Sequence, residues 1–145
     1  MKKKLLIFSI ILACIIVFCF VKNKDNDKDG YYVLKKDNIP SIDKVLGKRN
    51  LISKNKKNDN NNLIKTYIYD KIEDVYSDLS IYTDYLINEL NYNITNDFNL
   101  NKESGTINLA TNSIENKYVL IMEIKYSKRK YTIKITRGKG RIKVS

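Results

Sequence analysis

Three aspartates near the N-terminus are spaced as the ligands of a metal ion would be. Asp25, Asp27 and Asp29 alternate in the stretch KDNDKDG, which ends at Gly30. A calcium-binding EF-hand loop takes oxygen ligands from positions 1, 3 and 5, turns at a glycine in position 6, and needs a bidentate glutamate at position 12. Position 12 is Lys36, whose charge repels a cation. The stretch is therefore interpreted as a hydrated linker, and weak calcium binding by the three aspartates is the alternative.

The chain lacks the residue types on which nucleophilic and zinc-based catalysis usually depends. It contains no histidine, and its two cysteines, Cys14 and Cys19, both lie in the first apolar run. Neither a Cys/His metal site nor a serine–histidine pair is therefore available. Glu73, Asp74 and Asp78 are close in sequence, but they stand at the start of a predicted helix, where carboxylates usually cap the helix or stay solvated. We predict a non-enzymatic protein with no catalytic residues and no cofactor.

The C-terminal end carries most of the positive charge. The whole chain has a net charge of +11, and residues 117–145 hold ten basic side chains and one acidic one, whereas residues 23–116 are net −2. Clustered cations attract polyanions. We predict an anion-binding site at one hairpin tip and its outer face, formed by Lys125, Lys128, Arg129, Lys130 and Lys134, with Arg137 at the start of a basic tail that extends it.

An uncharged apolar run, LLIFSIILACIIVFCFV, occupies residues 5–21 between two lysines. As a helix these 17 residues span about 25 Å, close to the thickness of a bilayer core. We predict a membrane anchor over residues 1–22, a single-pass signal anchor with the N-terminus inside and the rest of the chain outside the cell membrane. Two alternatives remain, a leader that is cleaved to give a secreted protein and a lipoprotein signal in which Cys14 carries the lipid.

Apolar residues at helical spacing predict one amphipathic helix over about residues 72–90, and Asn91 is suited to end it. Apolar residues predict strands over 48–54, 62–70, 92–100, 105–111, 117–126 and 131–137, and the asparagine-rich segment 55–62 predicts a loop between the first two. In the last strand Tyr131, Ile133 and Ile135 are expected to face inward, and Thr132, Lys134 and Thr136 outward. We predict an α+β fold in which the helix packs on an antiparallel β-meander, preceded by the transmembrane helix. The expected organisation is a juxtamembrane stalk over 23–38 and a single domain over 39–145.

A resemblance accompanies this layout. Tyr67-Ile68-Tyr69 precedes a helix that contains Leu79, Tyr82 and Leu86, and Gly105 introduces the last strands. This order resembles small, N-terminally anchored or lipoprotein-like extracytoplasmic proteins of Gram-positive bacteria, whose function is undescribed. The resemblance covers residues 40–137 and implies a bacterial, extracytoplasmic protein, but it carries no catalytic residue over to this chain.

These observations predict an anchored, non-catalytic domain that binds an anionic partner through its basic C-terminal end. The expected partners are the membrane itself through residues 5–21, and cell-wall polymers or anionic lipid headgroups on the outer side. Nucleic acid is the expected partner only if the domain is cytoplasmic. The alternative is an accessory subunit that docks to another protein.

Overall fold

The computed structural model of this chain describes residues 27–143. Six strands form an antiparallel sheet in the order β3-β4-β8-β7-β6-β5, and β1 and β2 form a separate two-stranded sheet. The elements in chain order are β1 (Tyr31–Leu34), β2 (Asp37–Pro40), α2 (Ile42–Leu46), β3 (Leu51–Asp59), β4 (Asn62–Tyr69), α3 (Val75–Leu90), β5 (Asn93–Ile94), β6 (Gly105–Asn112), β7 (Tyr118–Ser127) and β8 (Lys130–Lys139).

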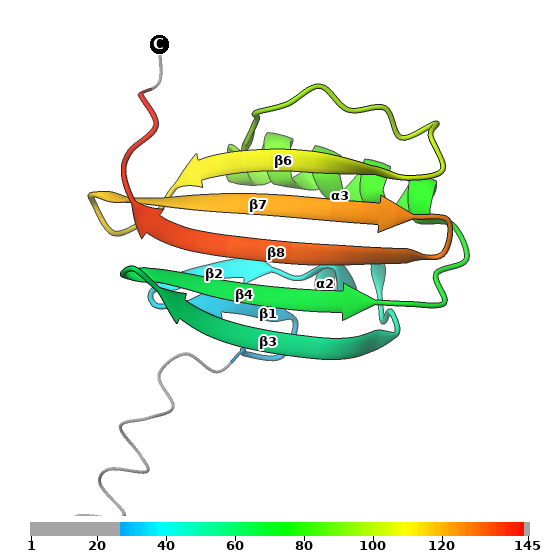
Figure 1. Ribbon diagram of the computed structural model, residues 1–145, viewed down its shortest axis with the longest axis horizontal. Helices are drawn as coiled ribbons and strands as arrows, with labels where there is room; N and C mark the ends of the chain where they lie inside the picture. The colour runs from blue at the N-terminus through cyan, green and yellow to red at the C-terminus, as the bar shows by residue number, and fades with distance from the viewer. Residues whose placement is uncertain (1–26, 144–145) are drawn as a thin grey trace, which may run out of the picture.

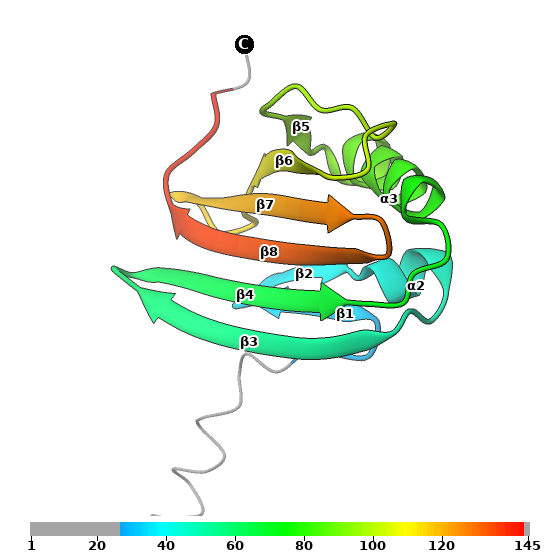
Figure 2. The same cartoon turned by 45° about the vertical axis from the view of Figure 1, so that its right-hand side comes forward.

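The six-stranded sheet has one covered face and one uncovered face. Figures 1 and 2 both place α3, α2 and the β1–β2 hairpin on the same side of the sheet. On that side the strands contribute alternate buried residues, including Tyr131, Ile133 and Ile135 of β8. The residues between them are only partly buried or exposed. No element within residues 27–143 covers this second face, which is called the open face below.

Helix α3 is amphipathic and packs its apolar stripe on the sheet. Val75, Leu79, Tyr82 and Leu86 are spaced at three- and four-residue intervals, and all are buried. The Asp74 carboxylate accepts a hydrogen bond from the Ser77 N–H and caps the first turn. The predicted helix is confirmed with a later start, and Asn91 ends it in the left-handed conformation, as predicted.

The N-terminal segment 27–49 is held to the rest of the fold by three partly or fully buried ion pairs. Asp27 meets Lys65 of β4 at 2.8 Å, Asp37 meets Arg137 of β8 at 3.2 Å, and Arg49 meets Asp78 of α3 at 2.6 Å. Hydrogen bonds add to them: the hydroxyls of Tyr32 and Tyr69 lie 2.8 Å apart, and the Tyr82 hydroxyl donates to the Pro40 carbonyl. The β1–β2 hairpin is thus a built-in part of the core. This differs from the stalk expected over residues 23–38.

The asparagine-rich segment 55–62 is paired strand rather than the predicted loop. Strand β3 runs to Asp59 and β4 begins at Asn62, so only Asn60 and Asn61 make the turn. Both have positive φ, at 46° and 68°, which suits a two-residue hairpin turn and which asparagine tolerates better than most residues. The polar residues of β3 fit there because every one of its nine positions is exposed.

The predicted fold class is wrong. Strands, not a balance of helix and strand, dominate the described residues, and the fold is a mostly β structure built on the six-stranded antiparallel sheet. The prediction missed the β1–β2 sheet. It also placed the strand that corresponds to β3 over residues 48–54, whereas β3 continues to Asp59. The transmembrane helix in the same prediction has no counterpart in residues 27–143, where no helix is long and apolar enough to cross a membrane. Its segment, 5–21, and Cys14 lie outside the described residues.

Candidate functional site

The register of β7 and β8 brings three lysines together on the open face. Lys125 lies directly opposite Thr132, Ser127 lies opposite Lys130, and Glu123 lies opposite Lys134. Lys130 and Lys134 are therefore the residues of β8 on either side of Thr132 on the same face of the sheet. Lys125 is the residue of β7 directly opposite Thr132. We call Lys125, Lys130, Lys134 and the central Thr132 the basic sheet patch.

The side chains of this patch are accessible and carry a net positive charge. The Lys125 side chain is 64% exposed, the Lys134 side chain is 44% exposed, and Lys130 is exposed as well. Glu123 is the acidic side chain that, within residues 27–143, pairs with them, 3.5 Å from the Lys125 ammonium and 3.9 Å from that of Lys134. A single carboxylate shared by two ammonium groups leaves the patch net positive. Exposed ion pairs of this kind are weak, so an incoming anion can compete for both lysines.

The hairpin tip next to the patch holds Lys128 and Arg129, both exposed. The carbonyl of Arg129 accepts a hydrogen bond from the Ile72 N–H, which fixes the tip against the segment before α3. The Lys128 ammonium lies 3.5 Å from a carboxylate oxygen of Glu103, and both side chains are about four-fifths exposed. These two cations therefore extend the patch toward one end of the sheet.

Arg137 does not belong to this surface. It is 6% exposed, its Nε donates to Asp37 at 3.2 Å, and another nitrogen of its guanidinium donates to Glu115. The guanidinium also stacks over the Tyr118 ring, 3.7 Å from the ring centroid. The burial of Arg137 could have been predicted from the sequence, because Arg137 follows Ile133 and Ile135 at two-residue spacing and so shares their inward-facing side.

The aspartates of the predicted calcium loop are placed differently from metal ligands. Oδ1 of Asp27 accepts hydrogen bonds from the Lys65 ammonium at 2.8 Å and from the Tyr67 hydroxyl at 2.9 Å. Asp29 is exposed and Asp25 lies outside the described residues. Within residues 27–143 no three Asp, Glu, His or Cys side chains gather as a metal site would require. An ammonium group occupies the position beside Asp27 where a cation would bind.

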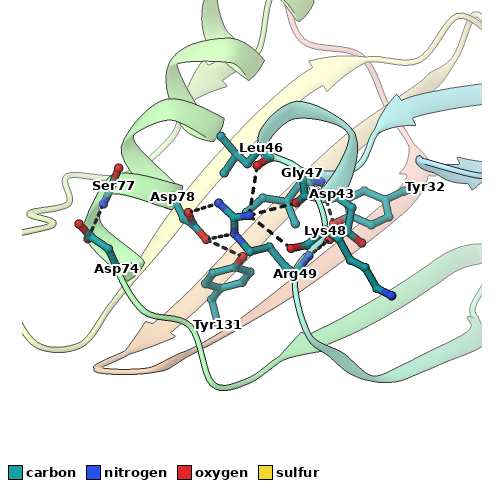
Figure 3. Close-up of polar contacts among 11 residues, drawn as sticks. Tyr32, Asp43, Leu46, Gly47, Lys48, Arg49, Asp74, Ser77, Asp78 and Tyr131 are labelled. Atoms are coloured by element: carbon teal, nitrogen blue, oxygen red, sulfur yellow. Dashed lines mark hydrogen bonds and ion pairs between the residues drawn. The ribbon is translucent and has the colours of Figure 1, made fainter.

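The carboxylates near the start of α3 line a polar cleft of about 490 Å³. Two of the residues that line it, Arg49 and Asp78, face each other in Figure 3. Nε and Nη2 of Arg49 donate to the two carboxylate oxygens at 2.6 and 2.7 Å, and Nη1 donates to the Leu46 and Gly47 carbonyls. The Tyr131 hydroxyl donates to the same carboxylate at 3.2 Å. Asp78 therefore has a structural role: its carboxylate ties α3 to Arg49 and to Tyr131 of β8. The sequence pattern did not predict this role for Asp78 or for Arg49.

Charge is unevenly distributed around the fold. Residues 70–103, which include α3, carry eight acidic and two basic side chains, a net charge of −6, whereas residues 117–143 carry ten basic and one acidic. Helix α3, whose own charged residues are all acidic, and the basic sheet patch lie on opposite sides of the sheet.

Comparison of the chain with known protein families, with characterised proteins and with solved structures finds no match. The resemblance to small extracytoplasmic proteins of Gram-positive bacteria therefore stays a prediction. The functional argument depends on the geometry of the chain itself.

Proposed function

We propose that this protein is a non-catalytic binding domain that holds a linear, phosphate-bearing polymer against the open face of its sheet. The observation that carries the proposal is the convergence of Lys125, Lys130 and Lys134 around Thr132. Lysine ammonium groups bind phosphate as point charges, and the threonine hydroxyl can donate one further hydrogen bond. Diagonal neighbours on a sheet are about 7–8 Å apart, so successive anionic groups of an extended polymer can each reach a lysine.

The surroundings of the patch favour a polymer without bases over single-stranded nucleic acid. Proteins that hold single strands usually stack the bases on exposed aromatic rings. The outward-facing positions of β7 and β8 carry no aromatic residue, and Tyr126 and Tyr131, which flank the hairpin tip in sequence, are both buried on the opposite face. Charge and hydroxyl groups are thus what the patch offers to a ligand.

The test is the binding of linear polyphosphate to the full chain, measured by calorimetry at several salt concentrations. We expect binding to weaken by about tenfold or more between low and moderate salt, because phosphate contacts release counterions. Replacing Lys125, Lys130 and Lys134 together by serine should abolish it. The matched control replaces the exposed Lys28, Lys36 and Lys48 by serine, which removes the same charge elsewhere and should leave most of the affinity.

Two results would contradict the proposal. Equal loss of affinity in both triple variants would mean that only net charge matters, and unchanged affinity in the patch variant would mean that the polymer binds elsewhere. Vesicles of anionic lipid are the comparison ligand. If they bind and polyphosphate does not, the partner is a membrane surface rather than a polymer.

A further inference from the structure

Strand β3 forms one entire edge of the six-stranded sheet. It is nine residues long and, within residues 27–143, pairs with β4 alone, whereas the opposite edge is β5, which has two residues. All nine residues of β3 are exposed. Proteins commonly keep edge strands short or covered, since an open edge can pair with another chain. The length and exposure of β3 therefore single it out as an interaction surface.

The hairpin geometry shows which backbone groups point outward. A two-residue turn makes its flanking residues, Asp59 and Asn62, a hydrogen-bonded pair, and such pairs then alternate along the strands. Asn55 and Lys57 accordingly direct their backbone groups toward β4. Alternate residues from Lys54 to Asn58 direct theirs away from it, toward the place that a seventh strand would occupy.

The side chains of β3 select for acidic residues in such a strand. Lys54 and Lys57 are three residues apart and so lie on opposite faces of the sheet, with side chains 62% and 69% exposed. The Asp27 carboxylate lies 3.6 Å from the Lys54 ammonium, and the Asp59 carboxylate lies 3.5 Å from that of Lys57. The pair of Lys57 and Asp59 is exposed and therefore contributes little. Ile52, which is 53% exposed, adds an apolar contact at the start of the strand.

The same charges argue against a second copy of this chain as the occupant. Two antiparallel β3 strands would set lysines of one copy against lysines of the other, and like charges opposite each other on neighbouring strands are destabilising. We propose that β3 is a docking edge for an extended acidic segment of a partner protein, which adds to the sheet as a seventh strand. This surface is separate from the basic sheet patch and does not depend on polymer binding there.

The test uses the full chain and a ten-residue probe peptide that repeats Val-Glu-Glu, so that its glutamates lie on both faces of the added strand, as Lys54 and Lys57 do. A control peptide has proline in place of each valine, so that it keeps the charge but cannot form a ladder. Amide hydrogen exchange of β3 is followed by NMR. We expect the valine peptide to slow exchange at Lys54 and Asn58, whose N–H groups point outward. Exchange at Asn55 and Lys57, already bonded to β4, should change little.

Variants separate this surface from the patch. Replacing Lys54 and Lys57 by serine should weaken peptide binding about fivefold, from the loss of two cross-strand charge pairs, and leave polyphosphate binding nearly unchanged. The triple serine variant of the patch should still bind the peptide. Three results would each overturn the proposal that β3 is a docking edge. The valine peptide does not bind, the proline peptide binds equally well, or the valine peptide binds without slowing exchange at Lys54 and Asn58.

Discussion

Asp37 and Arg137 lie one hundred residues apart in the sequence and form a buried ion pair, with Nε of Arg137 donating to Oδ2 of Asp37 at 3.2 Å. Asp37 also accepts hydrogen bonds from the Ser113 hydroxyl and the Ile114 N–H. The pair joins β2, the loop before β7 and β8 in one network. It explains why one cation of the basic C-terminal end supports the fold instead of facing a partner.

Replacing Arg137 by alanine should destabilise the fold without weakening anion binding. Removal of one member of a buried pair leaves the other charge uncompensated, and we expect the free energy of unfolding to fall by about 3–5 kcal/mol. Urea denaturation measures this change. The exposed Lys139 provides the control, since its replacement by alanine should change the same quantity by less than about 0.5 kcal/mol.

The polyphosphate affinity of the folded Arg137→Ala variant should match that of the unaltered protein. A variant that stays as stable as the original but loses most of its affinity would place Arg137 in the binding surface, contrary to its observed burial.

Asp27 should make stability depend on pH in the acid range. Burial alone would raise the pKa of Asp27, but hydrogen bonds from Lys65, the Val33 N–H and Tyr67 outweigh it and hold this pKa below its ordinary value. Folding therefore gains from the ionised form above the unfolded pKa of about 4, and the gain disappears as the pH falls through the lower folded pKa.

The Asp27→Asn variant should be less stable than the original protein at pH 6, and the difference should shrink steadily as the pH is lowered toward 2. Denaturation curves at several pH values measure it. A difference that stays constant over this range would show that ionisation of Asp27 has no part in anchoring the N-terminal segment.

Buried tyrosines should limit stability in alkali. Burial is the largest cause that raises the pKa of six of them, Tyr32, Tyr67, Tyr69, Tyr82, Tyr92 and Tyr131. Because the folded pKa exceeds the unfolded value of about 10, their contribution is complete below pH 10 and is lost as the pH rises further.

An alkaline titration that records tyrosinate absorbance and circular dichroism together tests this expectation. The six should ionise in the same steep transition in which the β-sheet signal disappears. Ionisation of all eleven tyrosines while the sheet signal persists would contradict the buried hydroxyl network.

Glu123→Gln should strengthen polymer binding. Its carboxylate lies within 4 Å of both Lys125 and Lys134, so it partly neutralises the patch and repels an incoming anion. Removal of an exposed charge pair changes the energy by about 0.2–1 kcal/mol, which corresponds to a gain of up to about fivefold in affinity. Calorimetry with polyphosphate at low salt measures the gain, and Glu89→Gln on α3 serves as the control. A weaker affinity in Glu123→Gln would imply that Glu123 orients the lysines rather than opposing the ligand.

The alternation of apolar and polar residues correctly predicted which side chains of the last strand face the core. It placed Tyr131, Ile133 and Ile135 inside and Thr132 and Lys134 outside, and all five lie as predicted. Continued to Arg137, the same alternation places this residue inside, but the prediction assigned it to the anion-binding surface. A charged residue on an apolar face needs a partner, and that partner, Asp37, is one hundred residues away. Such distant pairings leave no local pattern in a single sequence.

Most of the edge strand and the whole N-terminal hairpin were missed, for different reasons. Strand β3 is an edge strand exposed on every residue, so it has no buried face to impose the alternation by which strands are recognised. The hairpin was assigned to a stalk because charged residues surround it, yet Tyr32, Val33 and Leu34 are buried. Its burial follows from long-range contacts such as that between the hydroxyls of Tyr32 and Tyr69.

The central claim is that the open face binds an extended anion at the basic sheet patch, and NMR titration of the full chain with linear polyphosphate at low salt tests it most directly. We predict that the largest shifts of backbone amide signals occur at Lys125, Lys130, Thr132 and Lys134. Residues of α3, on the opposite and acidic side, should remain unchanged. Shifts centred on α3, or no shifts at any concentration of the polymer, would contradict the account.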